Sequence, residues 1–300
     1  MNIVGRKNWY FGLSLLVLIP GIIALFLWGL NLSIDFTGGS RLTLAFKDNV
    51  TKNNVELVDK TLKAQQIKVA SIEKSKKLIF VRTSPMDQNQ NSKFMDALSK
   101  NVKQQEFETI GPVIGQETTL NALKAVGIAS VLIIIYITWS FRKVPKPASS
   151  LRFGVCAIIA LVHDVLVVVG VFAILGHFFG VEVDSLFVTA ILTVIGFSVH
   201  DTIVVFDRIR ENLKKTGSSN FAKTVNESII QTIARSLNTS LTVVLVLIAL
   251  LLFGGESIRW FVVALLIGVI SGTYSSIFNA APLLVLWQEI SNKKQAISNK

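Results

Sequence analysis

The sequence is poor in cysteine and in charged residues. Its single cysteine, Cys156, lies in an apolar run. One cysteine cannot form a disulfide framework or a cysteine-based metal site, so both are excluded. Only 16% of the 300 residues are charged, whereas 51% are hydrophobic. The mean hydropathy is +0.57. This composition excludes an ordinary soluble protein and indicates a protein that crosses a membrane several times.

The charge that is present is mostly positive, with a net charge of +11. A nucleic-acid-binding protein would carry such a charge on a basic soluble face with interleaved aromatic residues. Here most of the excess lies in loops beside apolar segments. This distribution is typical of loops that stay in the cytoplasm. We therefore expect a lipid bilayer around the chain and no nucleic-acid partner.

The first apolar run lacks the features of a cleavable signal peptide. Arg6 and Lys7 precede it, as they would in a signal peptide. The run 9–30 is longer than the usual apolar core of a signal peptide and contains no small-x-small cleavage site. We interpret residues 1–31 as a cytoplasmic N-terminus followed by a first transmembrane helix.

Residues 32–117 lack any apolar run long enough to cross a bilayer. Their hydrophobic pattern alternates instead, and it predicts the order βαββαβ. The predicted strands are 41–46, 68–73, 78–83 and 106–110, and the predicted helices are 53–65 and 92–102. The polar stretch 85–92 is interpreted as a loop. Two split βαβ units of this kind form an antiparallel sheet with two helices on one face, so we expect an α+β ferredoxin-like domain.

Five further apolar segments follow in residues 118–288, which gives an α-helical polytopic membrane protein with six transmembrane helices. The five segments are about 120–141, 153–175, 186–206, 237–253 and 260–287. Lys and Arg are concentrated near the N-terminus, after the second span, in the loop 207–236 and in the tail 289–300. By the positive-inside rule these segments are cytoplasmic. The inserted domain is then extracytoplasmic.

Two aspartates lie within the predicted spans. Asp201 is in the fourth span and Asp164 is in the third. A carboxylate at the centre of a span costs about 2.5–3.5 kcal/mol on insertion scales, so it normally faces the bundle interior and has a partner. Burial favours a neutral carboxyl and a nearby arginine favours a charged one, so a moving Arg235 would switch Asp201 between the two states. We interpret Asp201 and Arg235 as a proton relay pair, with Asp164 and His200 as secondary candidates.

Each candidate also has a purely structural alternative. Asp201 fits a buried ion pair or a helix-to-helix hydrogen bond without a transport role. Asp164 is as compatible with packing as with a relay, since the sequence places no second charge within obvious reach. His163 and His200 each precede an aspartate, but the i,i+3 or i,i+4 pairs of a helical metal site are missing. We therefore expect no metal and no cofactor.

The last span contains Gly268 and Gly272, four residues apart, with several serines nearby. Small residues at this spacing let two helices approach closely. We interpret them as a packing face, either within the bundle or against a partner.

Six motifs together resemble the SecD/SecF family of the Sec preprotein translocase, within the resistance-nodulation-division superfamily. They are S-I-D-F-T-G-G at 33–39, I-G-P-V-I-G at 110–115, L-V-H-D-V at 161–165, the block 195–212, S-L-N-T-S-L at 236–241 and G-V-I-S-G-T-Y-S-S at 268–276. The resemblance covers nearly the whole chain. The block 195–212 and the run 236–241 are its most specific parts.

The resemblance implies a six-span bundle that pairs with SecD into a twelve-span unit. That unit would use the proton gradient to assist protein export, without a hydrolytic site. The implied partners are SecD, the channel SecYEG, SecA, YidC and the unfolded polypeptide in transit. The implied location is the plasma membrane of a bacterium, with a thylakoid membrane as the alternative.

The resemblance also assigns roles to particular residues. The family's functional pair is the aspartate of the fourth span and the arginine just before the fifth, which fall on Asp201 and Arg235. The family commonly has asparagine before that aspartate, whereas this sequence has His200. Gly38 and Gly39 fall at a hinge position, where glycine absorbs large changes in φ and ψ. A plain turn into the first strand is equally compatible with them.

Two alternatives come from other classes of protein. An intramembrane aspartyl protease would use Asp164 and Asp201 as a dyad, but its Gly-x-Gly-Asp signature is absent, because the residues 198–200 are Ser-Val-His. A proton-driven exporter of lipids or small molecules from the same superfamily would need a substrate path. The one inserted domain and six spans are small for that purpose.

Overall fold

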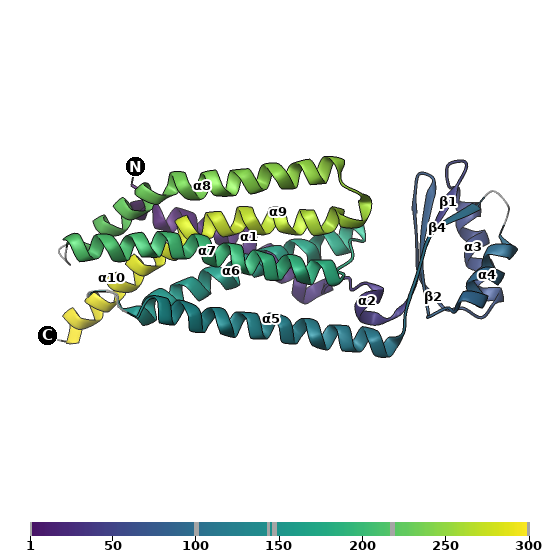
Figure 1. Cartoon of the computed structure of the whole chain (residues 1–300), viewed down its shortest axis with the longest axis horizontal. Coiled ribbons are helices and arrows are strands. Elements are labelled where there is room, and N and C mark those ends of the chain that lie inside the picture. Colours follow the sequence, from purple (N-terminus) through teal and green to yellow (C-terminus); the bar gives the residue numbers. More distant parts are fainter. Residues whose placement is uncertain (1, 99–101, 143–144, 146–148, 217–219, 299–300) are drawn as a thin grey trace. The chain divides into compact units, whose positions relative to one another are not determined.

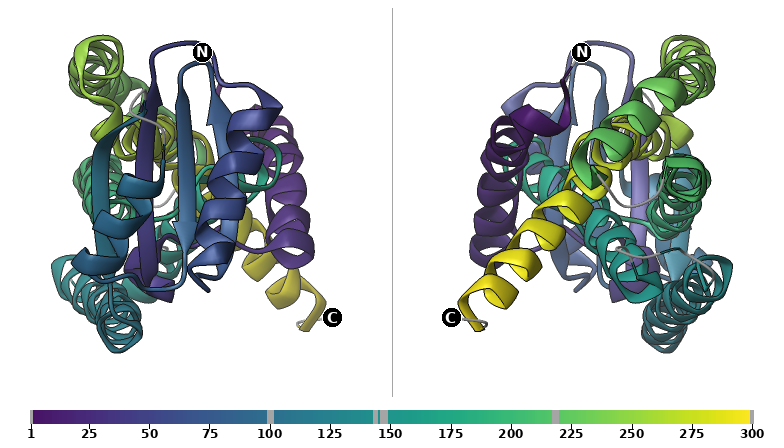
Figure 2. Two further views of the ribbon diagram at one scale, coloured as in Figure 1. Left: turned by 90° about the vertical axis from the view of Figure 1, so that its right-hand side faces the viewer. Right: turned by 90° about the vertical axis from the view of Figure 1, so that its left-hand side faces the viewer.

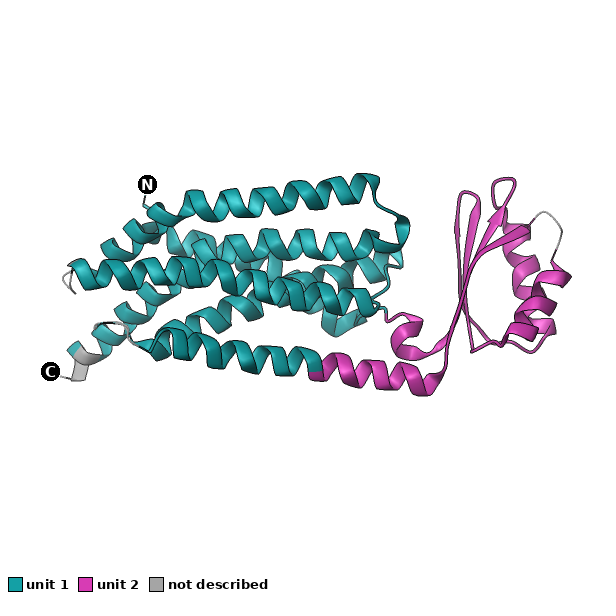
Figure 3. Cartoon of the chain, in the orientation of Figure 1, with its two compact units in different colours: residues 1–31, 125–300 teal, residues 32–124 magenta. Residues whose placement is uncertain are grey.

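The computed structural model describes residues 2–98, 102–142, 145, 149–216 and 220–298. Two compact units are present, which Figure 3 colours separately. The first consists of Met1–Asn31 and Ala125–Lys300, and the second of Leu32–Lys124. The second unit includes the domain expected at 32–117 and the first turns of the following helix.

The first unit is a helical bundle (Figure 1). Its helices are α1 (Lys7–Trp28), α5 (Pro112–Ser140, which starts in the second unit), α6 (Ser150–Phe179), α7 (Ser185–Thr216), α8 (Phe221–Phe253), α9 (Arg259–Ser275) and α10 (Ala281–Ser298). A π-helical turn, Ser276–Ala280, joins α9 to α10. Six helices or joined helices are long and apolar enough to cross a membrane within the described ranges, and they correspond to the six predicted spans. The last of them is α9 and α10 together.

Glycines let the helices of the bundle approach one another closely. A Cβ atom on Gly268 would lie 2.0 Å from Val194 Cγ2, and one on Gly272 would lie 3.1 Å from Ser198 Cβ. The small-residue face of α9 therefore packs on α7, inside the chain itself, which decides between the two interpretations of this face. On α6, a Cβ on Gly170 would lie 2.6 Å from the Cα of a glycine in α1.

The predicted loop 207–236 is wrong for most of its length. Helix α7 continues to Thr216 and α8 already begins at Phe221. The two extensions pack on each other: Asn212 Nδ2 donates hydrogen bonds to Ser228 Oγ at 2.8 Å and to Gln231 Oε1 at 2.9 Å. Hydropathy marks only the part of a helix that lies in lipid, so it misses a helix that extends into water.

The second unit contains one four-stranded antiparallel sheet in the described part of the chain, in the order β2-β3-β1-β4. Its elements are α2 (Ile34–Thr37), β1 (Gly39–Phe46), α3 (Lys52–Ala64), β2 (Val69–Ser75), β3 (Leu78–Thr83), α4 (Gln88–Ala97) and β4 (Val102–Ile110). After α2 the order is βαββαβ, as predicted. Helices α3 and α4 lie on one face of the sheet (Figure 2, left) and enclose an apolar core with it.

The second helix of this unit was misplaced by the sequence pattern. It covers Gln88–Ala97 instead of 92–102, so the predicted loop 85–92 is wrong from residue 88 onwards. Asp87 and Gln90 form a capping box, in which the side chain of each accepts a hydrogen bond from the backbone N–H of the other, at 2.8 and 3.0 Å. A capping box starts a helix in a stretch too polar to show an apolar period.

Candidate functional site

Asp164 is completely buried on α6 and joins that helix to two others. Its Oδ2 accepts hydrogen bonds from Ser198 of α7 and Ser275 of α9, both at 2.6 Å. Its Oδ1 accepts one from Ser271 of α9 at 2.7 Å. The Nδ1 atom of His163 lies 3.0 Å from the same oxygen. The carboxylate form of Asp164 matches all these donors at once, with His163 in the tautomer that carries a proton on Nδ1.

Asp201 is also buried, on α7, but its contacts are fewer and longer. It is 2% exposed. The hydroxyl of Ser240 on α8 lies 3.5 Å from its Oδ2, and the hydroxyl of Thr273 on α9 lies 3.3 Å from the same atom. The two hydroxyls are 2.5 Å from each other. Asp201 therefore lies where α7, α8 and α9 meet, and its contacts are at the upper limit of hydrogen-bond length.

The structure does not bring Arg235 to Asp201. Arg235 is an exposed residue of α8, and within the described ranges no ion pair joins it to Asp201. It lies five residues before Ser240, which is about 7.5 Å along the helix axis. His200 is exposed, unlike its neighbour Asp201. The relay pair of Asp201 and Arg235 stays a prediction.

Hydroxyl groups of α7, α8 and α9 contact the two carboxyls and one another, and the sequence does not show which hydroxyl meets which carboxyl. The hydroxyls of Thr202 and Ser276 are 2.8 Å apart, and Ser276 Oγ also donates to the backbone oxygen of Ser198 at 3.3 Å. One signal was available: Ser271 and Ser275 lie four residues apart in the last span, and so share a helix face. From the sequence we interpret that face as a packing face, because glycines occupy the same turns.

The two aspartates have separate partners. No hydrogen bond joins their carboxyls in the part of the chain that the structure describes, and no residue donates to both. In the same part, no group of three or more His, Cys, Asp or Glu residues has the proximity of a metal site. Among the described residues, each carboxyl therefore has its own set of hydroxyl partners.

The glycines of the S-I-D-F-T-G-G motif are required by the backbone. Gly38 and Gly39 have φ angles of +71° and +127°. A Cβ on Gly38 would lie 2.8 Å from Pro112 Cα, and one on Gly39 would lie 2.7 Å from Thr83 O. These contacts are all within the second unit. They explain both glycines as a tightly packed turn into β1, and a hinge role for them stays a prediction.

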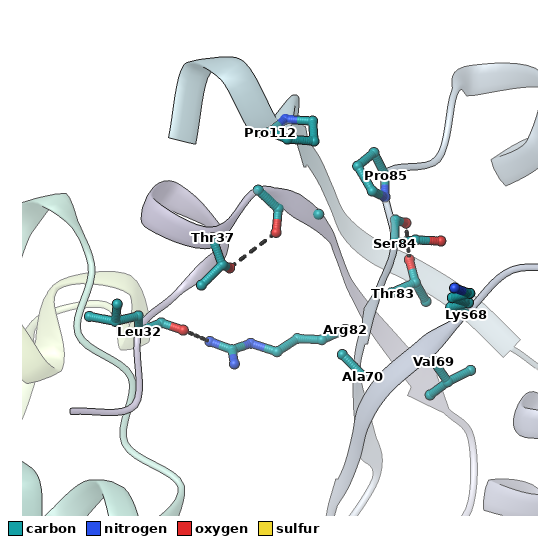
Figure 4. Close-up of a pocket in the computed structure, with 12 residues that line it drawn as sticks. Leu32, Thr37, Lys68, Val69, Ala70, Arg82, Thr83, Ser84, Pro85 and Pro112 are labelled. Atoms are coloured by element: carbon teal, nitrogen blue, oxygen red, sulfur yellow. Dashed lines mark hydrogen bonds between the residues drawn. The ribbon is translucent and has the colours of Figure 1, made fainter. Parts of the chain in front are cut away.

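A pocket lies beside this turn in the second unit (Figure 4). Lys68 and Arg82 line it together with the two glycines. The guanidinium of Arg82 donates a hydrogen bond to the backbone oxygen of Leu32 at 2.9 Å. The arginine therefore fastens the first residue of this unit to its sheet.

Family models match most of the chain. The family described as "Protein export membrane protein SecD/SecF, C-terminal" matches residues 90–290, and the "SecD/SecF GG Motif" matches residues 23–50. The second match includes the glycine turn before β1. The first includes both buried aspartates and the serines around them.

Known proteins resemble the chain over almost its full length. "Protein translocase subunit SecF" of Thermobaculum terrenum is 45% identical over 96% of this chain and 94% of its own length. "Protein translocase subunit SecDF" of Bacillus subtilis is 36% identical, over 98% of this chain but only 39% of its own length. The crystal structure of SecDF from Thermus thermophilus superposes with a TM-score of 0.81 at 34% identity, over 96% of this chain and 39% of that one. These matches confirm the resemblance found in the motifs, and the chain belongs to the SecD/SecF family of protein export membrane proteins.

Proposed function

We propose that this chain is the SecF-type half of a proton-driven unit that assists protein export, with SecD as the other half. The names of the relatives support this role, since they are protein translocase subunits. In Bacillus subtilis a similar sequence makes up 39% of a longer SecDF protein. Two sequences that are fused in one organism commonly work together when they are separate. SecYEG, SecA, YidC and the exported polypeptide are partners of the whole assembly in this proposal.

The observation that carries the proposal is the placement of Asp201. It is buried at the meeting point of three helices, and within the described residues it has two long hydrogen bonds, both from hydroxyls. A carboxyl with so few donors can gain or lose a proton without breaking a dense network. One proton that moves down 100 mV releases about 2.3 kcal/mol, which is enough to bias a two-state arrangement of helices.

Arg235 is a residue of α8. The same helix carries Ser240, one of the two hydroxyl contacts of Asp201. A rotation or shift of α8 would therefore withdraw the hydroxyl and bring the guanidinium closer. In this proposal Arg235 faces Asp201 in a second state of the unit and stabilises its charged form there.

The protease alternative has no observation in its favour, because Asp164 and Asp201 have separate partners. An exporter of lipids or small molecules would use the same proton site, and differs only in its cargo. The single cargo that the relatives' names support is protein.

The test is proton-driven export of a reporter protein by the complex with SecD in native membrane vesicles, with and without an uncoupler. Each value is normalised to the amount of folded complex. We expect Asp201→Asn to remove the uncoupler-sensitive component while the complex persists, and Arg235→Met to remove most of it. A protease would instead lose activity equally in Asp164→Asn and Asp201→Asn and tolerate Arg235→Met. Uncoupler-sensitive export by Asp201→Asn at the normal level would rule the proton site out.

The chain is a multi-pass membrane protein, and in this proposal it lies in a bacterial plasma membrane with both termini in the cytoplasm. Contacts at one end of the bundle support a location of both termini on the same side of the membrane. The backbone N–H of Ile3 donates to Asn226 Oδ1 at 2.8 Å, and Lys7 forms an ion pair with Glu289 at 2.5 Å. The N-terminus, the start of α8 and the last helix therefore meet at the same end. Arg152, from the basic stretch after the second span, also donates to Ser291 Oγ of α10 at 3.1 Å.

Labelling with an impermeant thiol reagent in a Cys156→Ala background tests this orientation. Lys93→Cys is exposed on α4 and should react from the extracytoplasmic side of intact cells. Lys215→Cys, at the end of α7, should react only after permeabilisation. The reverse pattern would contradict the orientation.

We also infer that the second unit is a ferredoxin-like domain. The strand order β4-β1-β3-β2 in an antiparallel sheet, with α3 and α4 on one face, supports this assignment. Its proposed place outside the cytoplasm puts it where an emerging polypeptide would pass.

A further inference from the structure

The partners of Asp164 and of Asp201 alternate along the same two helices. On α7, Ser198 binds Asp164 and precedes Asp201 by three residues. On α9, Ser271 and Ser275 bind Asp164, and Thr273 lies midway between them and reaches Asp201. Residues two apart point to nearly opposite sides of a helix, since each residue turns the helix by about 100°. Asp164 therefore holds one side of α9 while Asp201 is contacted from the other.

We propose that Asp164 is a positioning residue for the proton site: it fixes α7 and α9 relative to each other so that the Thr273 hydroxyl reaches Asp201. The inference rests on the proposed function of Asp201. Asp164 itself does not carry the transported proton in this account. Its role is to provide one fixed acceptor for hydroxyls of two helices.

The lengths of the contacts support this division of roles. The three serine contacts of Asp164 are 2.6–2.7 Å long, whereas the two contacts of Asp201 are 3.3 and 3.5 Å. Short hydrogen bonds to a carboxylate are about twice as strong as those between neutral groups. The position of α9 is thus determined at Asp164, and the contact of Thr273 follows from it.

Close packing at the same place leaves little freedom for another arrangement. A Cβ on Gly272 would lie 3.1 Å from Ser198 Cβ and 3.6 Å from Asp164 Oδ2. The π-helical turn starts one residue after Ser275, and its first residue, Ser276, bonds both Thr202 and the Ser198 backbone. Single π-helical turns inside α-helices are frequent at functional sites. Here the turn gives α7 a second attachment beside Asp164.

Within the described residues, few ionisable side chains lie on the stretches of α6, α7, α8 and α9 that surround the two carboxyls. Helix α6 contributes His163, whose buried Nε2 has no hydrogen-bond partner within the described residues, and α7 contributes the exposed His200. Helix α8 contributes the exposed Arg235. Helix α9 contributes Tyr274, which donates to the backbone oxygen of Tyr10 at 2.8 Å. A change in the pH profile of the complex can therefore be assigned to Asp201 or to one of these few groups.

The experiment compares variants in the SecD-containing complex, in the same export assay, over a range of pH. Thr273→Val removes the hydroxyl contact of Asp201 directly. The shift that it causes in the pH profile is the reference with which the other variants are compared. We expect Asp164→Asn to shift the profile in the same direction as Thr273→Val, and to lower uncoupler-sensitive export about tenfold per folded complex. Ser271→Ala should shift it in that direction too, with about a threefold loss.

Two matched variants serve as controls. Ser271→Thr keeps the hydroxyl and should restore the normal profile. Ser130→Ala removes a serine of α5 whose one hydrogen bond within the described residues goes to Val126 O of its own helix, and should leave the profile unchanged. The serine variants keep the test valid even if Asp164→Asn does not fold.

Three outcomes would overturn the inference. If Asp164→Asn abolishes uncoupler-sensitive export at every pH while Ser271→Ala is normal, Asp164 carries a proton itself. If the variants lower only the amount of folded complex and leave the pH profile unchanged, Asp164 stabilises the bundle and nothing more. A shift opposite to that of Thr273→Val would also contradict it. Failure of the proposed function looks different, because Asp201→Asn would then keep its uncoupler-sensitive export.

Discussion

Asp164 and Asp201 lie on neighbouring helices of one bundle, yet their surroundings differ. Both are at most 2% exposed. Asp164 has three serine hydroxyls and a histidine within 3.0 Å, whereas Asp201 has two hydroxyls at 3.3 and 3.5 Å. A buried carboxyl with a full set of donors is suited to hold helices together. A buried carboxyl with few donors is suited to change its charge. Burial alone does not distinguish the two roles, whereas the number and length of the hydrogen bonds do.

The largest difference in stability is expected from truncation of the two carboxyls. Asp164→Ala leaves three buried serine hydroxyls without their acceptor and should lower the free energy of unfolding by about 3–5 kcal/mol. Asp201→Ala should cost about 1–2 kcal/mol, since its contacts are long. Thermal unfolding of the purified protein in one detergent measures both. Equal losses would remove the distinction between the two sites.

The next largest loss of stability is expected from a change at the close contact between α9 and α7, because this contact brings the hydroxyl partners of both carboxyls into place. Gly268→Ala places a Cβ 2.0 Å from Val194 Cγ2 and should cost about 1–3 kcal/mol of stability. Val194→Ala in the same chain should restore part of the loss. Gly196→Ala is the control, since a Cβ there meets no atom within 4 Å. If Gly268→Ala is as stable as the control, the glycines do not set the distance between α7 and α9.

The smallest effects are expected from single hydroxyls, and they should still rank the two sites. Ser275→Ala removes a 2.6 Å hydrogen bond to Asp164 and should cost about 1.5–3 kcal/mol. Thr273→Val removes a 3.3 Å contact with Asp201 and should cost less than about 1 kcal/mol. Thermal unfolding of the purified protein in the same detergent measures both losses. A greater loss from Thr273→Val would mean that Asp201 is the more firmly bonded carboxyl.

The spans and the order of the soluble elements could be predicted from the sequence, because each depends on a local hydrophobic pattern. The ends of helices could not. Helix α7 extends to Thr216 through residues that are too polar to read as a span, and α4 starts at a capping box around Asp87. At α4 side-chain hydrogen bonds, rather than apolar periodicity, fix the boundary, and the extension of α7 is held by the hydrogen bonds of Asn212 to α8.

The two aspartates could be found in the sequence because charges are rare inside spans, but their partners could not. Which residues surround a buried carboxyl depends on how each helix is rotated and how closely the helices pack. Ser198, Ser271 and Thr273 come from helices far apart in the sequence, and single serines in spans are too common to stand out. The expected contact with Arg235 is not present in this arrangement of the helices, since α8 presents Ser240 to Asp201 instead.

Infrared difference spectroscopy of the complex with SecD in lipid, recorded as a function of pH, tests the central claim most directly. A protonated carboxyl gives a carbonyl band that its ionised form lacks, and the method needs no access of a reagent to the buried site. The account predicts a band that grows as the pH falls, is lost in Asp201→Asn and is kept in Asp164→Asn. A band that is kept in Asp201→Asn and lost in Asp164→Asn would contradict the account.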